Sequence, residues 1–251
     1  MYLISKKHFV MSLVLLSGVL LGAQSAQANT TFAGSSVLTF TINSITNLND
    51  AHPTDLSGLQ ILGSFLQPTD EFSFYANTTG DGAISANNPE VASFAVTSSF
   101  SKTFAVSGSV LDGSVDSHHT GLYNLAFNNT GLDDYAIDLT LAYQLNASAN
   151  DLTAESNVAV DYYNQTFSVS DFATVGAYTL AESLSDTQSV IGSFAPYTFT
   201  LNAGSNELVF ANVVITGNLQ AAPVPLPAAT WLFLTGLIGV LGFNKHKTKR
   251  A

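Results

Sequence analysis

Apolar and polar residues alternate strictly in the middle of this chain. In residues 135–145 (YAIDLTLAYQL) large apolar side chains occupy the odd positions, and smaller or polar side chains occupy the even ones. A period of two places the two sets on opposite faces of a β-strand, so the pattern predicts a strand with one buried face and one solvated face. Residues 122–127 (LYNLAF) alternate in the same way, and the NNTG sequence at 128–131 is typical of a hairpin connection between the two.

Shorter alternating segments recur through the rest of the chain. They predict further strands at 36–43, 71–76, 91–97, 102–110, 157–163, 166–170, 196–202 and 207–216. Residues 202–206 (NAGSN) have the composition of a tight turn between the last two. One segment differs, because the leucines of residues 54–66 (TDLSGLQILGSFL) share a helical face with Phe65, and Thr54 is a suitable N-cap. We therefore expect a short helix there.

The ten predicted strands and their Ser-, Thr-, Asn- and Gly-rich connections indicate an all-β fold. We expect one antiparallel β-sandwich domain at residues 29–221, of the immunoglobulin-like or jelly-roll kind. It would be flanked by an N-terminal signal-peptide helix at 1–28 and a C-terminal hydrophobic helix within 222–251. No fixed-period repeat is evident, which argues against a solenoid or a propeller.

The distribution of charge changes the picture of the surface. Between residues 29 and 221 the chain has eighteen Asp and Glu residues but a single basic residue, Lys102, so this body carries a net charge of −17 and no arginine. Such a surface repels nucleic acid and anionic lipid, which are bound mainly through Lys and Arg. The apolar fraction of 46% still supplies a sizeable core. With no cysteine in the chain, that core must hold the fold without disulfides.

The N-terminal segment has the three parts of a secretory signal peptide. Lys6 and Lys7 precede an apolar run at residues 9–21, and small residues follow at Ala26 and Ala28. We expect signal peptidase to cut before Asn29. The alternative is an uncleaved N-terminal anchor.

The C-terminal segment is an apolar run between a proline motif and a basic tail. The run from Ala228 to Phe243 has no charged residue and contains Trp231 and three glycines at a spacing of three, which are Gly236, Gly239 and Gly242. As a helix, sixteen residues are about 24 Å long, slightly short for a bilayer core of about 30 Å. The tail residues Lys245, Lys247, Lys249 and Arg250 would stay in the cytoplasm by the positive-inside rule.

These parts, in this order, resemble the PEP-CTERM sorting signal of Gram-negative bacteria. The matching residues are Val224, Pro225, Leu226 and Pro227, followed by the apolar helix and the basic tail. Leu226 replaces the glutamate of the usual Pro-Glu-Pro, a variant also seen in the family. The resemblance implies an exported protein, held transiently in the inner membrane and then processed by an exosortase, in a bacterium that makes exopolysaccharide or biofilm. The alternative is a permanent tail anchor.

Residues 77–84 (NTTGDGAI) match part of an EF-hand calcium loop. Asn77, Thr79 and Asp81 stand at the first, third and fifth ligand positions, and Gly82 stands at the turn position. The twelfth position falls on Asn88 rather than on a glutamate. We keep two interpretations, a calcium site and an ordinary glycine-rich turn. Calcium would also relieve the repulsion between carboxylates on so acidic a surface.

Other polar clusters give weaker indications of chemistry. We expect residues 116–119 (DSHH) to form a solvated loop, because adjacent histidines on a strand point to opposite faces and cannot easily share an ion. Asp133 and Asp134 are interpreted as solubilising charge rather than a glycosidase pair. Neither a Gly-x-Ser-x-Gly nor a His-Glu-x-x-His motif occurs. Tyr162, Tyr163 and Tyr197 are either core or strand-face residues, or rings that stack on sugars.

We therefore expect a non-catalytic protein of the cell surface or extracellular matrix, with no cofactor other than calcium. Its partners would be signal peptidase and exosortase during processing, and polysaccharide afterwards. The second hypothesis is a carbohydrate-binding module with a defined sugar site. The third is a secreted glycan hydrolase.

Overall fold

Strands account for nearly all regular structure in the computed structural model of this protein. The structure describes residues 29–49, 55–68, 70, 72–87, 92–93, 99–151, 153–179, 183–221 and 236. Within them the chain forms thirteen strands: β1 (Thr30–Asn47), β2 (Leu59–Leu66), β3 (Phe74–Gly80), β4 (Ala83–Ala86), β5 (Ala92–Ser93), β6 (Ser99–Val110), β7 (Gly113–Asn129), β8 (Tyr135–Asn150), β9 (Ala154–Asn164), β10 (Ser170–Tyr178), β11 (Ser185–Ser193), β12 (Tyr197–Leu201) and β13 (Asn206–Gln220).

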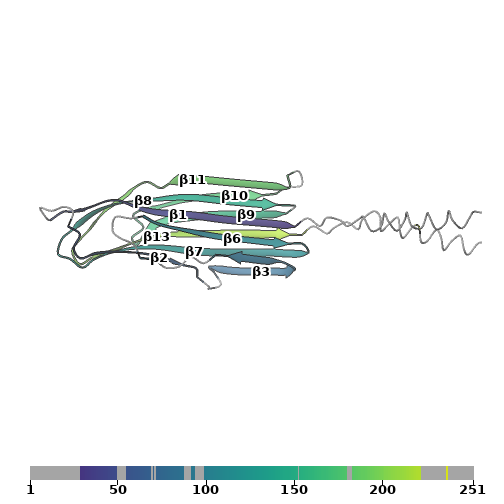
Figure 1. Ribbon diagram of the computed structural model, residues 1–251, viewed down its shortest axis with the longest axis horizontal. Helices are drawn as coiled ribbons and strands as arrows, with labels where there is room; N and C mark the ends of the chain where they lie inside the picture. The colour runs from purple at the N-terminus through teal and green to yellow at the C-terminus, as the bar shows by residue number, and fades with distance from the viewer. Residues whose placement is uncertain are drawn as a thin grey trace, which may run out of the picture. The chain divides into compact units, whose positions relative to one another are not determined.

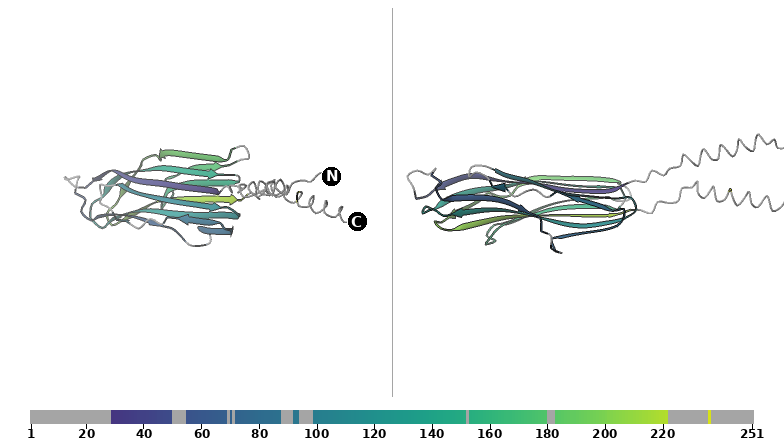
Figure 2. Two further views of the ribbon diagram at one scale, coloured as in Figure 1. Left: turned by 45° about the vertical axis from the view of Figure 1, so that its right-hand side comes forward. Right: turned by 60° about the horizontal axis from the view of Figure 1, so that its bottom comes forward.

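The strands form two antiparallel sheets that lie one over the other (Figure 1 and, edge-on, Figure 2). Sheet A has the order β11-β8-β1-β6-β4, with β12 also paired to β8. Sheet B has the order β10-β9-β13-β7-β2-β5, with β3 also paired to β7. The all-β, two-sheet prediction is thereby confirmed. The first strand, β1, and the last, β13, occupy central positions in opposite sheets, each with a hydrogen-bonded neighbour on both sides.

The core lies between the sheets and follows from the period-two pattern. Every second residue of the long strands is buried, so that β8 alone contributes Tyr135, Ile137, Leu139 and Leu141, all 0% exposed. Aromatic rings meet across the gap between the sheets, as where Phe65 of β2 lies 5.6 Å from Phe104 of β6. Burying each such side chain contributes roughly 1.5–3 kcal/mol. One continuous core therefore holds both sheets.

The ring of Phe32 in β1 is tightly enclosed by two glycines, one in each sheet. A Cβ atom added to Gly217 of β13 would lie 2.2 Å from the Phe32 ring, and one added to Gly108 of β6 would lie 2.3 Å from it. Real Cβ atoms do not come so near. The ring therefore fits only because both neighbours are glycine, and any larger residue would overpack the core.

The start of β1 and the end of β13 lie at the same end of the two layers, which we call the base (Figure 1). The turn between β8 and β9 holds the start of β1 and the end of β13 there. Thr30 Oγ1 donates a hydrogen bond of 3.3 Å to Asp151 Oδ2, and Thr153 Oγ1 donates to the carbonyl of Gln220. Asp151 and Thr153 have φ values of 72° and 60°, which non-glycine residues rarely adopt. The turn is thus kept in a costly conformation that fixes both ends.

The structure corrects several predicted elements. Residues 59–66 are not helical but form β2, because all eight pair with β7 and because the strand buries Leu59, Ile61 and Phe65 on the core. On its other face Leu62 and Leu66 are about half exposed. Together with the buried residues, these two leucines produce the helical spacing of apolar residues in the sequence.

The expected hairpin between residues 122–127 and 135–145 is also wrong, since β7 belongs to sheet B and β8 to sheet A. The turn at 202–206 does form, with Gly204 at φ 68°, but it too joins strands of opposite sheets. The predicted strand at 166–170 is mostly a turn between β9 and β10. The sequence pattern did not predict β4, β10, β11 or the first half of β7.

Candidate functional site

Near the base, the outer face of sheet A carries small, uncharged side chains in register across five strands. One row contains Ser85, Ser107, Ala33, Ser148 and Thr187, which lie side by side on β4, β6, β1, β8 and β11. The rows above and below have the same character, with Asn87, Ala105, Ser35, Asn146 and Ser189 in one and Ala83, Ser109, Thr31, Asn150 and Ser185 in the other. None of these fifteen residues is ionisable at neutral pH.

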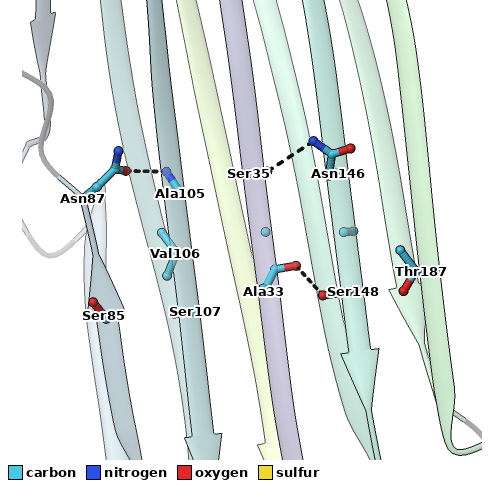
Figure 3. A pocket seen from close by; sticks show the side chains of 12 residues that line it. Ala33, Ser35, Ser85, Asn87, Ala105, Val106, Ser107, Asn146, Ser148 and Thr187 are labelled. Carbon is cyan, nitrogen blue, oxygen red and sulfur yellow. Dashed lines mark hydrogen bonds between the residues drawn. The ribbon is translucent and has the colours of Figure 1, made fainter.

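A shallow trough runs across this face, with a volume of about 370 Å³ (Figure 3). A second hollow of about 390 Å³ continues it toward the base and shares Ala33, Ser85, Ser107 and Ser148 with it. The trough exists because the residues at its floor are too short to fill the curved face of the sheet. Its lining contains Ala33, Gly34, Ser35, Ser85, Asn87, Ala105, Val106, Ser107, Asn146, Ala147, Ser148 and Thr187.

Hydrogen bonds hold the polar groups at the rim of the trough in place. Asn87 extends the edge of β4, since its Oδ1 accepts from the amide of Ala105 and its Nδ2 donates to the carbonyl of Thr103 at 3.0 Å. Asn146 Nδ2 donates to Ser35 Oγ at 3.3 Å, and Asn146 Oδ1 accepts from Ser189 at 2.9 Å. These amides are therefore oriented before any ligand arrives, which lowers the entropic cost of binding.

Other hydroxyl groups of the trough are free to bind a ligand. Among the described residues, the side chains of Ser85, Ser107 and Thr187 form no hydrogen bond with protein atoms. Each hydroxyl can donate one hydrogen bond and accept two. The trough thus offers a fixed array of neutral donors and acceptors on a body whose net charge is −17. It suits an uncharged, hydroxyl-rich partner better than an ion.

The residues predicted to bind calcium lie where β3 turns into β4. Asn77 and Thr79 share a face of β3, opposite Asp116 and Ser114 of β7, and Asp81 follows in the turn. Thr79 Oγ1 accepts a 2.8 Å hydrogen bond from the amide of Ser114. The segment is therefore a strand and a tight turn rather than a twelve-residue loop between helices. Calcium binding by these three residues stays a prediction.

Asp81 has a structural task in this turn. Its Oδ1 accepts hydrogen bonds of 2.9 Å from the amides of both Leu111 and Asp112, in the turn between β6 and β7. These two donors, Asp112 first, lower the pKa of the Asp81 carboxyl below its ordinary value. The connections β3–β4 and β6–β7 each run from one sheet to the other. Asp81 therefore links these two connections by hydrogen bonds at the base.

Residues 116–119 are part of β7 and not the solvated loop expected from the sequence. His119 points into the core and is 2% exposed, with its Nδ1 3.3 Å from Gln67 Nε2 and its Nε2 without a hydrogen-bond partner among the described residues. Burial, and to a lesser extent the neighbouring His118, lowers the pKa of His119 below 6.5. His118 faces outward and stacks on Tyr75 at 5.6 Å.

The three tyrosines named in the sequence analysis lie in different surroundings, and stacking of any of them on a sugar stays a prediction. Tyr162 is 1% exposed and stacks on Phe194 in the core. Tyr197 is partly buried, and its hydroxyl donates a hydrogen bond to Glu207 Oε1 at 3.1 Å. Burial, with the Glu207 carboxylate, raises the pKa of Tyr197. Tyr163 alone lies on an outer face of the sandwich, in a cluster of rings that the sequence did not reveal.

Asp133 and Asp134 each accept a hydrogen bond from another segment of the chain and do not face each other across a cleft. Asp133 Oδ2 accepts a 2.8 Å hydrogen bond from Asn47 Nδ2, and Asp134 Oδ1 accepts one of the same length from the amide of Ala203. Both carboxylates thus bind the connections at the end of the sandwich opposite the base. Within the described ranges, no three His, Asp or Glu side chains are grouped so as to hold a metal ion.

Most residues of the predicted processing signals lie outside the described residues. This applies to Ala26 and Ala28, to the sorting motif at 224–227, and to the hydrophobic and basic positions 228, 231, 239, 242, 243, 245, 247, 249 and 250. Gly236 is described as a single exposed residue in helical conformation. In the part of the chain that the structure describes, no helix is long and apolar enough to span a bilayer.

Comparison with known proteins does not assign this chain to a family. A scan against protein families finds no match, and no curated protein matches the sequence significantly.

Proposed function

We propose that this protein is an exported, non-catalytic component of the cell surface or extracellular matrix that adheres to exopolysaccharide through the trough on sheet A. The observation that carries the proposal is the charge-free trough, lined by hydroxyl and amide groups, on a body of net charge −17. Neutral polysaccharide presents many hydroxyl groups and no charge to be desolvated, so it matches this face chemically. An anionic polymer would be repelled by the surrounding carboxylates.

The proposed route of export rests on the sequence signals at both chain ends. A signal peptide at 1–28 and a PEP-CTERM-like sorting signal at 222–251 would both engage the inner membrane in the precursor. The body is compatible with that route, because β1 starts and β13 ends at the same base. An exosortase would then remove the C-terminal helix near Pro225 and Pro227.

At the level of fold, we propose a sandwich with jelly-roll or immunoglobulin-like connections. Neighbouring strands come from distant parts of the chain, as where β1 pairs with β6 and β8. Successive long strands β6, β7, β8 and β9 alternate between the two sheets. Such crossing connections are typical of these architectures.

The adhesive role is tested by charging the trough of the exported protein. The double variant Ser107→Glu/Ser148→Glu places two carboxylates at its centre, and each must lose its hydration when a polymer binds. We expect at least about a tenfold loss in the fraction retained by the cell's own exopolysaccharide, measured by co-sedimentation.

The matched control is Thr103→Glu/Gln144→Glu, on the same faces of β6 and β8 but outside the trough lining. It changes the net charge in the same direction and should leave retention nearly unchanged. Retention of the Ser107→Glu/Ser148→Glu variant at the wild-type level would contradict the proposed role.

Sorting has a separate test, which is the intact mass of the mature protein. A mass that still includes residues 228–251 would exclude cleavage.

A further inference from the structure

Four aromatic side chains gather on the outer face of sheet B, at one end of β9, β10 and β13. The Tyr163 ring stacks with Phe167 at 5.1 Å and 10° between planes, and with Phe210 at 5.3 Å and 23°. Phe172 is on the same face of β10, directly beside Asp161, which is two residues before Tyr163 on β9. We call these four residues the aromatic cluster.

Two members of the aromatic cluster are open to solvent. Phe167 and Phe172 are each 69% exposed, whereas Tyr163 and Phe210 are half-buried. Folding gains little from rings in that position, because most of their apolar surface stays in water. Neighbouring exposed rings on a soluble protein are a mark of a contact surface.

The backbone presents Phe167 outward at an energetic cost. Its φ is 55°, a left-handed conformation that a bulky residue seldom adopts. The turn is held by its own hydrogen bonds, with the amide of Phe167 donating to the carbonyl of Asn164 at 3.0 Å and the buried side chain of Asn164 bonding both Thr166 and Ser168. Strain maintained by surrounding structure is found preferentially at functional sites. The turn thus fixes the direction in which the Phe167 side chain leaves the backbone before a ligand binds.

Planar polar groups surround the rings. Asp161 stands between Phe172 of β10 and Asn212 of β13 in the sheet register, and Asn124 of β7 stands opposite Phe210. Asn212 Nδ2 donates a 3.0 Å hydrogen bond to the Tyr163 hydroxyl, which fixes both side chains. Asp161 accepts hydrogen bonds, and the two amides both donate and accept. The face therefore combines apolar ring surface with fixed hydrogen-bonding groups.

This combination selects one class of ligand. A pyranose with equatorial hydroxyls has a C–H face that stacks on an aromatic ring and a rim of hydroxyls that bond carboxylate and amide groups. The absence of any Lys or Arg among the described residues of this face, together with a net charge of −17, disfavours uronate, sulfate or phosphate groups.

We propose that the aromatic cluster, with Asp161 and Asn212, is a binding site for a neutral glycan chain of equatorially substituted pyranoses. The inference rests on the proposed polysaccharide partner but assigns a second site on the face opposite the trough. In this arrangement Phe167 and Phe172 stack on sugar rings, and Asp161 and Asn212 bond the hydroxyls between them. The two sites would let one molecule bridge two polymer chains.

The experiment measures binding of cellohexaose to the exported protein by isothermal titration calorimetry, with alginate oligomers as the charged counterpart. We expect wild-type protein to bind cellohexaose and not alginate. Phe167→Gly and Phe172→Ala should each weaken binding at least about tenfold, as loss of a stacking ring does at protein interfaces. Phe167→Tyr keeps a ring and should restore binding to within a few-fold.

Phe167→Gly is a suitable variant because glycine adopts a positive φ without cost, so the turn is preserved. Ile191→Ala is the matched control, an exposed apolar residue, 75% accessible, on β11 of the other sheet. No binding of cellohexaose by wild-type protein, equal binding by the ring variants, or preference for alginate would each overturn the site. A change of oligomeric state in the ring variants without loss of sugar binding would do so as well.

The outcomes separate this inference from the proposed function. If the trough variant loses matrix retention while the ring variants bind cellohexaose like wild type, the aromatic cluster is not a glycan site and the adhesive function stands. If wild-type protein binds cellohexaose through the rings but is not retained by exopolysaccharide, the site stands and the matrix function is wrong.

Discussion

The outer faces of the two sheets share one core and differ in almost everything else. The face of sheet A presents three rows of serine, threonine, alanine and amide side chains without a charge, and it is hollowed by the trough. The face of sheet B presents the aromatic cluster, the Tyr75–His118 stack, and carboxylates at Asp116, Glu155 and Asp161.

The difference between the faces is informative because folding does not require it. A strand of alternating pattern needs apolar residues only on its inner face, and many polar residues are equally suitable on the outer one. The inner faces of both sheets are indeed alike, with aliphatic and aromatic residues throughout. What distinguishes the outer faces is thus better explained by contacts with partners than by stability.

The largest expected effect tests whether the two faces depend on a single core. Phe32→Ala removes the ring that contacts Gly108 and Gly217, and truncating a buried phenylalanine typically costs about 3–5 kcal/mol. Amide hydrogen exchange should accelerate in both sheets together, with a lower midpoint of urea unfolding. Val37→Ala, on the outer face of the same strand, should change the midpoint little. Faster exchange in one sheet alone would show two separable cores.

A smaller effect is expected in the pH dependence of folding stability, which should depend on His119 of sheet B. The pKa of His119 is lowered in the folded protein, so the unfolded chain takes up a proton first as the pH falls through 6.5. Folding stability contributed by the neutral ring is therefore present above pH 6.5 and is lost progressively below it, until the folded-state pKa is reached.

The measurement is the thermal midpoint between pH 7.5 and pH 5. Wild-type protein should lose stability across this interval, and His119→Leu should lose less. His118→Gln, at the adjacent outward position, is the control and should lose nearly as much stability as wild type, because His118 is the smaller cause of the lowered His119 pKa. Equal slopes for wild type and His119→Leu would show that the buried ring does not govern acid stability.

The smallest expected effect concerns calcium. Divalent ions reduce repulsion among carboxylates, so calcium should raise the thermal midpoint by a few degrees at most and should not alter polymer retention through the charge-free trough. If Asn77, Thr79 and Asp81 bind the ion, Asn77→Ala should reduce this gain, whereas Asn43→Ala, an exposed position on β1, should not. An identical response of both variants would place calcium elsewhere on the acidic surface.

The sequence by itself determined the class of fold and much of the core. Alternation in residues 135–145 identified β8 and its buried face, because burial on one side of a strand requires a period of two. The composition likewise gave a strongly acidic body without disulfides. Prediction was poor where strands have few large apolar residues, as in β10 and β11 at the sheet edges, because exposed edge strands need no such pattern.

Only the tertiary structure decided which strands pair and which outward-facing side chains become neighbours. The sequence could not show that residues 59–66 form a strand, since their second row of leucines is exposed, or that β7 and β8 lie in different sheets. The trough joins Ala33, Ser107, Ser148 and Thr187, and the aromatic cluster joins Tyr163 and Phe210, residues far apart in the chain. Local alternation specifies which side chains point outward, but the register between distant strands specifies which of them become neighbours.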